Sequence, residues 1–311
     1  MWLDVPAIPE RLGGALAIGN FDGVHLGHRA VVERLHRTGL PAAVLVPDPH
    51  PLQVLGRPGP LLTTMELRGR LLRVLGVEHL LRLPFDRATA EMEPGDFVQD
   101  VVLDRIGPRH VVVGFNFTYG RDARGDVATL GAALRRAGVE LEVVAPTLLG
   151  GEVVSSSRVR RAVQAGDLVG ATSLLGRPHV LAGTVRRGTA RGRAIGFPTA
   201  NVAPDPGLVA PAPGVYAVRC RALGATWDGV ANLGPRPTFG EVESLLEVHL
   251  LRFGGDLYDQ TLEVAFVGRL RGQQRFAGRE ALEAQIRRDV AVAEEMLGVA
   301  TLGWDMLGWA G

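Results

Sequence analysis

The stretch ALAIGNFDGVHLGH, residues 15–28, decides the fold of the first half of the chain. Its four leading residues, 15–18, are all aliphatic and predict a buried strand, and residues 27–38 carry an apolar stripe at helical spacing that ends before Gly39. Between them, Gly23 and Gly27 allow the backbone to approach a ligand closely. The start of the helix offers free N–H groups and the positive end of a dipole to an anion. The stretch therefore predicts a strand, a ligand-binding loop and a helix in succession.

Strands and helices go on alternating as far as residue 176. The apolar patterns predict further strands at 42–46, 80–83, 111–113 and 141–144, and helices at 64–75, 94–106 and 126–138. This alternation predicts an α/β domain, a doubly wound parallel sheet of the Rossmann-like type with right-handed crossovers. Ligands bind such sheets at the carboxyl ends of the strands, which is where residues 19–28 are expected.

The second half of the chain has a different pattern. Strand-like runs follow one another without helices between them, at 214–220, 227–233, 244–251 and 261–268, and a long helix is predicted at 278–297. This predicts an all-β domain, a small antiparallel barrel or sandwich with a C-terminal helix. A chain of 311 residues has the length of two domains. We expect them at 1–178 and 179–311, with the boundary near Arg177–His179.

The composition excludes several classes of protein. The 34 basic and 33 acidic residues give a net charge of +1, which argues against a bulk nucleic-acid binder. Every basic residue is arginine, so a Walker A loop, a protein kinase and a Schiff-base enzyme are excluded in their usual forms. The lone Cys220 excludes an internal disulfide and favours a reducing cytoplasm. The sequence shows no signal-peptide pattern, and it has no apolar run of about 18 residues, the length of a membrane segment.

Two histidines bracket Gly27 at the end of the first predicted strand. A lone histidine is most often structural, but His25 and His28 at a helix start are well placed to donate to phosphate oxygens. Such donors stabilise charge that develops on an α-phosphate during in-line displacement. We interpret the two side chains as catalytic.

The segment GNFDGVHLGH, residues 19–28, resembles the H-x-G-H signature of the nucleotidyltransferase superfamily. That signature alone leaves pantetheine-phosphate, nicotinamide and glycerol nucleotidyltransferases open. The whole string of residues 19–28 is most similar to the bacterial bifunctional riboflavin kinase/FMN adenylyltransferase (FAD synthetase) family. The segments GFNFTYG at 114–120 and SSSRVR at 155–160 resemble the same family. The resemblance implies that ATP is bound by Gly19, Asn20, Phe21, Asp22, Gly27, Ser155, Ser156 and Arg160, and the flavin by Asn116 and Phe117.

Each of these segments has a plainer interpretation as well. Ser155 suits a helix N-cap, and Arg160 suits an ordinary surface position. The family's F-D-P-H-P segment is here PDPHP at 47–51, with proline in place of phenylalanine. We therefore assign no role to His50.

Three segments of the second half resemble the family's kinase motifs. GFPTAN at 196–201 implies that Thr199 and Asn201 bind Mg²⁺ with hard oxygen ligands, although a capping turn would use the same residues. LEVHLL at 246–251 implies Glu247 as the catalytic base; His249 lies on the same strand face. In LRGQQRF, 270–276, Gln273 stands where the family has glutamate, so it receives no charge-dependent role. The resemblance further implies ATP contacts from Gly183, Gly188, Gly192 and Arg193, and flavin contacts from Arg271 and Phe276.

The resemblance implies a two-step enzyme. Riboflavin and ATP give FMN in the C-terminal domain, and FMN and ATP give FAD and pyrophosphate in the N-terminal domain. The small molecules riboflavin, FMN, FAD and ATP are the expected partners, Mg²⁺ is the expected cofactor, and no oligomeric state is assigned. The alternatives are a kinase that has lost the second activity and a flavin-binding regulatory protein. Separating the flavins formed from riboflavin, ATP and Mg²⁺ distinguishes the three.

Overall fold

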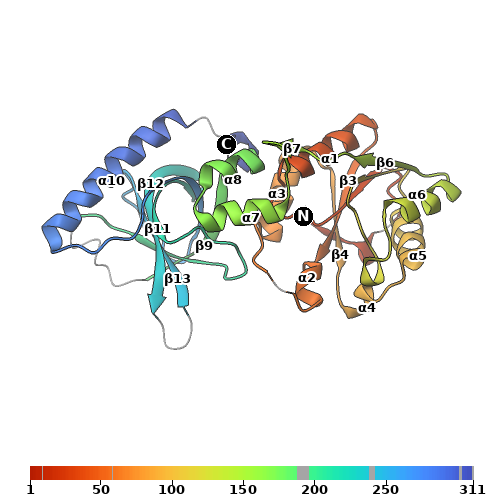
Figure 1. Ribbon diagram of the computed structural model, residues 1–311, viewed down its shortest axis with the longest axis horizontal. Helices are drawn as coiled ribbons and strands as arrows, with labels where there is room; N and C mark the ends of the chain where they lie inside the picture. Colours follow the sequence, from red (N-terminus) through yellow and green to blue (C-terminus); the bar gives the residue numbers. More distant parts are fainter. Residues whose placement is uncertain (9, 58, 188–195, 238–241, 301–302, 310–311) are drawn as a thin grey trace. The chain divides into compact units, whose positions relative to one another are not determined.

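The computed structural model describes residues 1–8, 10–57, 59–187, 196–237, 242–300 and 303–309 (Figure 1). Its internal contacts divide the chain into two compact units. The first comprises Met1–Gly59 with Thr64–Ser155, and the second Pro60–Thr63 with Ser156–Gly311.

The first unit is built on a parallel sheet of six strands. Their order is β1 (Leu3–Asp4), β4 (His79–Pro84), β3 (Ala42–Asp48), β2 (Ala15–Ile18), β5 (His110–Gly114) and β6 (Glu140–Val144). All four residues of β2 are buried, as in a sheet that helices cover on both faces. The strand order reverses at β2, because β3 lies on one side of it and β5 on the other. The predicted α/β fold is confirmed, and the loop after β2 lies at the topological switch point.

The helices of this unit include the predicted ones at 27–38, 64–75 and 126–138, and two short ones at 51–54 and 87–90 that were not predicted. They are α1 (Leu26–Arg37), α2 (Pro51–Val54), α3 (Met65–Val74), α4 (Arg87–Ala90), α5 (Pro94–Asp96) and α6 (Val127–Arg136), with short 3-10 turns at Val5–Ala7 and Arg121–Ala123 and a hairpin of β7 (Leu148–Leu149) and β8 (Glu152–Val153). The predicted helix 94–106 becomes a π-helix over Phe97–Ile106 and ends at Gly107, which has a left-handed conformation. Apolar spacing indicates a helix but does not distinguish this wider turn.

The second unit is a closed antiparallel barrel. Its strands run in the order β10 (Ala200–Pro204), β13 (Val242–Leu250), β12 (Ala225–Pro237), β11 (Gly214–Ala222), β14 (Thr261–Arg271) and β9 (His179–Arg186). Alternate residues such as Leu246, Val248 and Cys220 fill the interior. The long helix α10 (Arg279–Val299, blue in Figure 1) packs on the outside through Ala293 and Leu297. A 3-10 turn, Trp304–Leu307, follows it. The predicted barrel with its C-terminal helix is confirmed.

Two helices before the barrel belong to the second unit. They are α7 (Ser156–Ala165) and α8 (Leu168–Leu175), and Leu168 of α8 joins the apolar cluster of the barrel interior. The contacts therefore divide the chain between Ser155 and Ser156, earlier than the expected boundary near residue 178. Local composition changes only after α8, whereas α8 packs on β9 and β14, which come later in the sequence.

Candidate active sites

The loop after β2 is held in one conformation by its own side chains. His25 is the N-cap of α1, where its Nδ1 accepts a hydrogen bond from the backbone N–H of His28 at 3.3 Å. The two imidazole rings stack with centroids 3.7 Å apart, and the ring of Phe21 lies 5.0 Å from that of His28. A Cβ on Gly27 would stand 3.1 Å from the ring of His25. A side chain at residue 27 would therefore crowd the histidine pair.

A buried ion pair contacts this loop and stabilises it. Asp22 and Arg68 of α3 are each 1% exposed, and the guanidinium donates from Nη2 to Asp22 Oδ1 at 3.2 Å. Nη1 donates to the carbonyl oxygen of Asn20 at 3.0 Å. Asp22 was expected to contact ATP, whereas here its carboxylate binds an arginine of the protein. Arg68 has no sequence signal that links it to the loop, since 46 residues separate it from Asp22.

His28 is neutral at physiological pH in this environment. Burial lowers the pKa of its imidazole well below the ordinary value of 6.5, and the nearby His25 and Arg68 lower it further. Its Nδ1 is buried and makes no hydrogen bond within the part of the chain that the structure describes. A neutral imidazole carries one N–H and is suited to hydrogen bonding with a phosphate oxygen.

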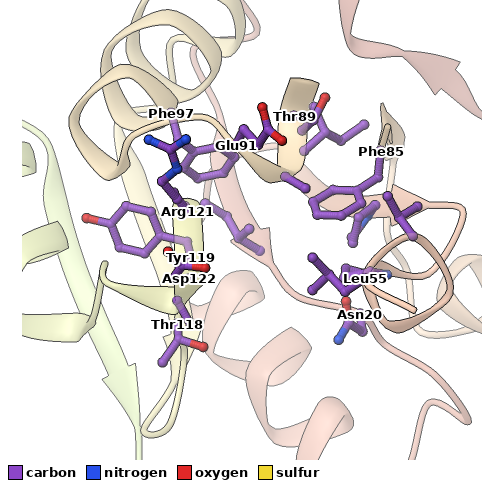
Figure 2. Close-up of a pocket in the computed structure, with 18 of the residues that line it drawn as sticks. Asn20, Leu55, Phe85, Thr89, Glu91, Phe97, Thr118, Tyr119, Arg121 and Asp122 are labelled. Carbon is purple, nitrogen blue, oxygen red and sulfur yellow. The ribbon is translucent and has the colours of Figure 1, made fainter. Parts of the chain in front are cut away.

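A cavity of ≈ 1080 Å³ opens at the carboxyl ends of β2, β3, β4 and β5. Asn20 of the loop lines it, with Leu55 and Phe85 on one side and Thr118 and Tyr119 on the other (Figure 2). Phe97 and Phe117 also line it, and their rings pack on Tyr119 at 5.5 and 5.6 Å. The cavity reaches the size typical of small-molecule sites, whose walls are mostly apolar and aromatic.

The remaining residues expected around the first site lie in different places. Gly19 and Phe117 line the cavity, whereas Asn116 is exposed in the turn after β5. Ser155 precedes α7, and Ser156 and Arg160 lie four residues apart on one face of that helix. Leu55 and Phe85 were not predicted, because they come from segments that only the fold brings together. Tyr119 belongs to the quoted segment 114–120, from which only Asn116 and Phe117 were named.

Glu247 lies in a row of polar side chains on the outer face of the barrel. Its neighbours on β13, Leu246 and Val248, are buried inside, so the alternation of the strand turns Glu247 outward. Asn201 of β10 and Asn232 of β12 are its two cross-strand partners in register. Asn232 Nδ2 donates to Glu247 Oε2 at 3.3 Å. Three neighbouring strands therefore place one carboxylate between two amides, one on each side.

The two expected magnesium ligands lie around the start of β10. Thr199 is exposed directly before the strand, and Asn201 is half-buried within it, opposite Glu247. Hydroxyl and amide oxygens are hard ligands that suit Mg²⁺ held mainly by phosphates and water. Next to them, His249 Nδ1 lies 2.8 Å from the carbonyl oxygen of Pro198, which connects this segment to β13. The donor set fits the ion.

The other residues expected in the second site have structural contacts. Arg271 forms an ion pair with the buried Asp289 of α10 at 2.9 Å, and its guanidinium lies 5.6 Å above the ring of Phe276. Gly183 lies in β9 opposite Pro204, where a side chain would collide with the backbone of β10. Gly188, Gly192 and Arg193 lie outside the described residues.

Comparison with known proteins assigns the chain to a family. The FAD synthetase family model matches residues 8–158, and the riboflavin kinase family model matches residues 175–297. A bifunctional riboflavin kinase/FMN adenylyltransferase from Pseudomonas fluorescens is 40% identical over 93% of this chain and 94% of its own length. The protein of the same name from Escherichia coli K12 is 38% identical over 92% and 94%. The chain belongs to the bifunctional riboflavin kinase/FMN adenylyltransferase family.

A solved structure has a similar fold. A macrolide-efflux protein from Streptococcus pneumoniae superimposes with a TM-score of 0.86 at 28% identity, over 94% of this chain and 98% of its own. Both units of the fold are therefore matched together in one solved chain. Within the described residues, no helix has the length and apolar character needed to cross a membrane.

Proposed function

We propose that this chain makes FAD from riboflavin in two steps. It phosphorylates riboflavin with ATP to FMN, and it transfers AMP from a second ATP to FMN, releasing pyrophosphate. The observation that carries the proposal is the presence in one chain of the histidine loop at the switch point of a parallel sheet and the Asn201–Glu247–Asn232 row on a barrel.

The kinase step is assigned to the barrel. The terminal ribityl hydroxyl of riboflavin attacks the γ-phosphorus of ATP, its proton passes to Glu247, and ADP leaves. Glu247 is suited to this role because it stands on a strand between Asn201 and Asn232 and accepts a hydrogen bond from the Asn232 amide. General-base assistance of this kind contributes roughly 10²–10⁴-fold.

The adenylyltransferase step is assigned to the first unit. A phosphate oxygen of FMN attacks the α-phosphorus of ATP, and the bond to pyrophosphate breaks. His25 and His28 stabilise the developing charge by hydrogen bonding, which a neutral His28 performs without losing a proton. We place the flavin ring in the cavity among Phe85, Phe117 and Tyr119, since aromatic walls suit a flat heterocycle.

The metal and the location of the reaction belong to the same proposal. Thr199 and Asn201 would hold Mg²⁺, which neutralises charge on the ATP phosphates when bound. The cytoplasm is the proposed location, in agreement with the lone cysteine of the chain.

Product analysis of three proteins tests the assignment. The wild-type chain with riboflavin, ATP and Mg²⁺ should form FAD. Glu247→Gln should lower the kcat of FMN formation by roughly 10²-fold or more while supplied FMN is still adenylylated. His28→Ala should accumulate FMN without FAD.

The outcomes separate the competing functions. Wild-type FMN without FAD would leave a kinase only, and no product would leave a flavin-binding protein. Equal losses of both half-reactions in one variant would indicate misfolding, and full kinase activity of Glu247→Gln would remove it as the base.

A further inference from the structure

His249 connects the strand of the proposed base to the segment of the expected magnesium ligands. Its Nδ1 lies 2.8 Å from the carbonyl oxygen of Pro198. A backbone carbonyl only accepts hydrogen bonds, so Nδ1 carries the proton and donates it. The ring of Phe197 meets the same imidazole edge to face, with the ring centroids 5.5 Å apart. The two residues before Thr199 are therefore both in contact with one side chain of β13.

The barrel fixes the position of His249 itself. Its backbone is paired in register with Val230 of β12. Val248 and Leu250 on either side of it are buried, so the alternation of the strand turns His249 outward. This is the face that carries Glu247, two residues earlier on the same strand. The side chain that holds the segment before β10 therefore stands directly beside the proposed base.

The two expected magnesium ligands differ in how the fold holds them. Asn201 is paired on both sides, with β9 and with β13. Thr199 is exposed and precedes the first residue of β10. The residue before it is a proline, which has no backbone N–H. The carbonyl of Pro198 is therefore the one backbone group of that residue that can form a hydrogen bond, and His249 binds it.

We infer that His249 is a positioning residue of the kinase site: by holding Pro198, it fixes Thr199 relative to Glu247. This inference rests on the proposed kinase activity and on Thr199 as a ligand of Mg²⁺. The strand pairing that fixes Asn201 does not extend to Thr199, so the hydrogen bond of His249 takes its place there. Replacing a residue that orients a metal ligand typically costs roughly 10–100-fold in metal affinity or activity.

Two replacements of His249 in the full chain separate its donor from its ring. His249→Phe keeps a ring against Phe197 and loses the donor. We expect it to raise KM for Mg-ATP in riboflavin phosphorylation about tenfold, with kcat and KM for riboflavin changed much less. His249→Asn loses the ring but offers an N–H on the corresponding δ atom, and it should retain a KM close to that of the wild type. The same two replacements of His79, exposed at the start of β4, should have little effect.

A double-mutant cycle tests whether His249 acts through Thr199. Thr199→Val removes the hydroxyl and keeps the shape of the side chain. In that background, His249→Phe should change KM for Mg-ATP by no more than about twofold. The same tenfold rise in both backgrounds would overturn the inference. So would an equal rise in His249→Phe and His249→Asn, or a loss confined to kcat.

A second measurement needs neither metal nor catalysis. Hydrogen exchange of the backbone amides in residues 197–202, followed by mass spectrometry of the metal-free chain, reports how often this segment opens. Exchange there should be faster in His249→Phe than in the wild type or His249→Asn, and exchange of β11 should be the same in all three.

Two results of this measurement would overturn the inference. One is unchanged exchange of residues 197–202 in His249→Phe, and the other is faster exchange throughout the barrel, which would indicate a general loss of stability. A wild-type chain that forms no FMN would contradict the proposed function, and the exchange rates would still decide whether His249 holds the segment.

Discussion

Arg68 carries one of the largest fully buried side chains of the described residues, and its charge is balanced by Asp22. Arg68→Met should lower the free energy of unfolding by about 3–5 kcal/mol, because it leaves a carboxylate buried without its cation. FAD formation should fall with it, since the same guanidinium holds the carbonyl of Asn20. Urea unfolding and the FMN adenylylation rate measure the two effects.

An exposed ion pair of the same unit is the matched control. Arg11 and Asp104 are 64% and 53% exposed, and Arg11→Met should cost only about 0–1 kcal/mol. If both methionine variants lost the same small amount, the buried pair would not stabilise the loop.

The lowered pKa of His28 predicts how stability depends on pH. Below its ordinary value of 6.5, the unfolded chain binds a proton at this residue and the folded chain does not. The free energy of unfolding should therefore decrease as the pH falls below 6.5, and it should be unaffected by this residue above that value. Urea unfolding between pH 5 and 8 should show a shallower decrease in His28→Phe than in the wild type. Parallel curves would contradict the burial of the imidazole.

At the scale of elements, helix α8 precedes the barrel in the sequence and packs on it. Five of its residues are buried: Leu168, Ala171, Thr172, Leu174 and Leu175. A fragment that begins at residue 179 exposes the barrel surface that α8 covers, whereas one that begins at residue 156 retains it.

The two fragments should therefore differ in stability. We expect 156–311 to unfold cooperatively and phosphorylate riboflavin, and 179–311 to be less stable by several kcal/mol, since each buried leucine contributes roughly 1.5–3 kcal/mol. Thermal unfolding followed by circular dichroism compares them directly. Equal melting temperatures would support the boundary expected near residue 178.

Elements with a local signal could be predicted from the sequence, and those that depend on distant partners could not. The strand 15–18 and the helix after it were predicted almost to the residue, because an apolar run, glycines and a cap lie together. Strand β10 was not predicted, since only pairing with β9 and β13 makes it extended. The same holds for the candidate site residues: the sequence motifs name the histidines and Glu247, whereas Arg68 and Phe85 become visible only in the fold.

At the scale of the whole molecule, the two half-reactions are assigned to different units. A mixture of His28→Ala and Glu247→Gln should therefore form FAD from riboflavin, although neither variant does so efficiently alone. The first supplies FMN to solution, and the second retains the histidine loop that adenylylates it. Separation of the flavins over time measures this, with each variant at the combined concentration as control. A mixture no better than its parts would show that released FMN is not reused.

The only cysteine of the chain is sealed inside the barrel, and this makes it a reporter of one unit alone. Cys220 is fully buried, and burial raises the pKa of its thiol far above the ordinary value, so the native protein should resist thiol reagents. Labelling then requires the barrel to open, while opening of the parallel sheet remains silent. The labelling rate should slow when riboflavin and Mg-ATP are added, if they stabilise the barrel. The labelling rate of this native side chain thus reports how often the barrel opens, without any engineered probe.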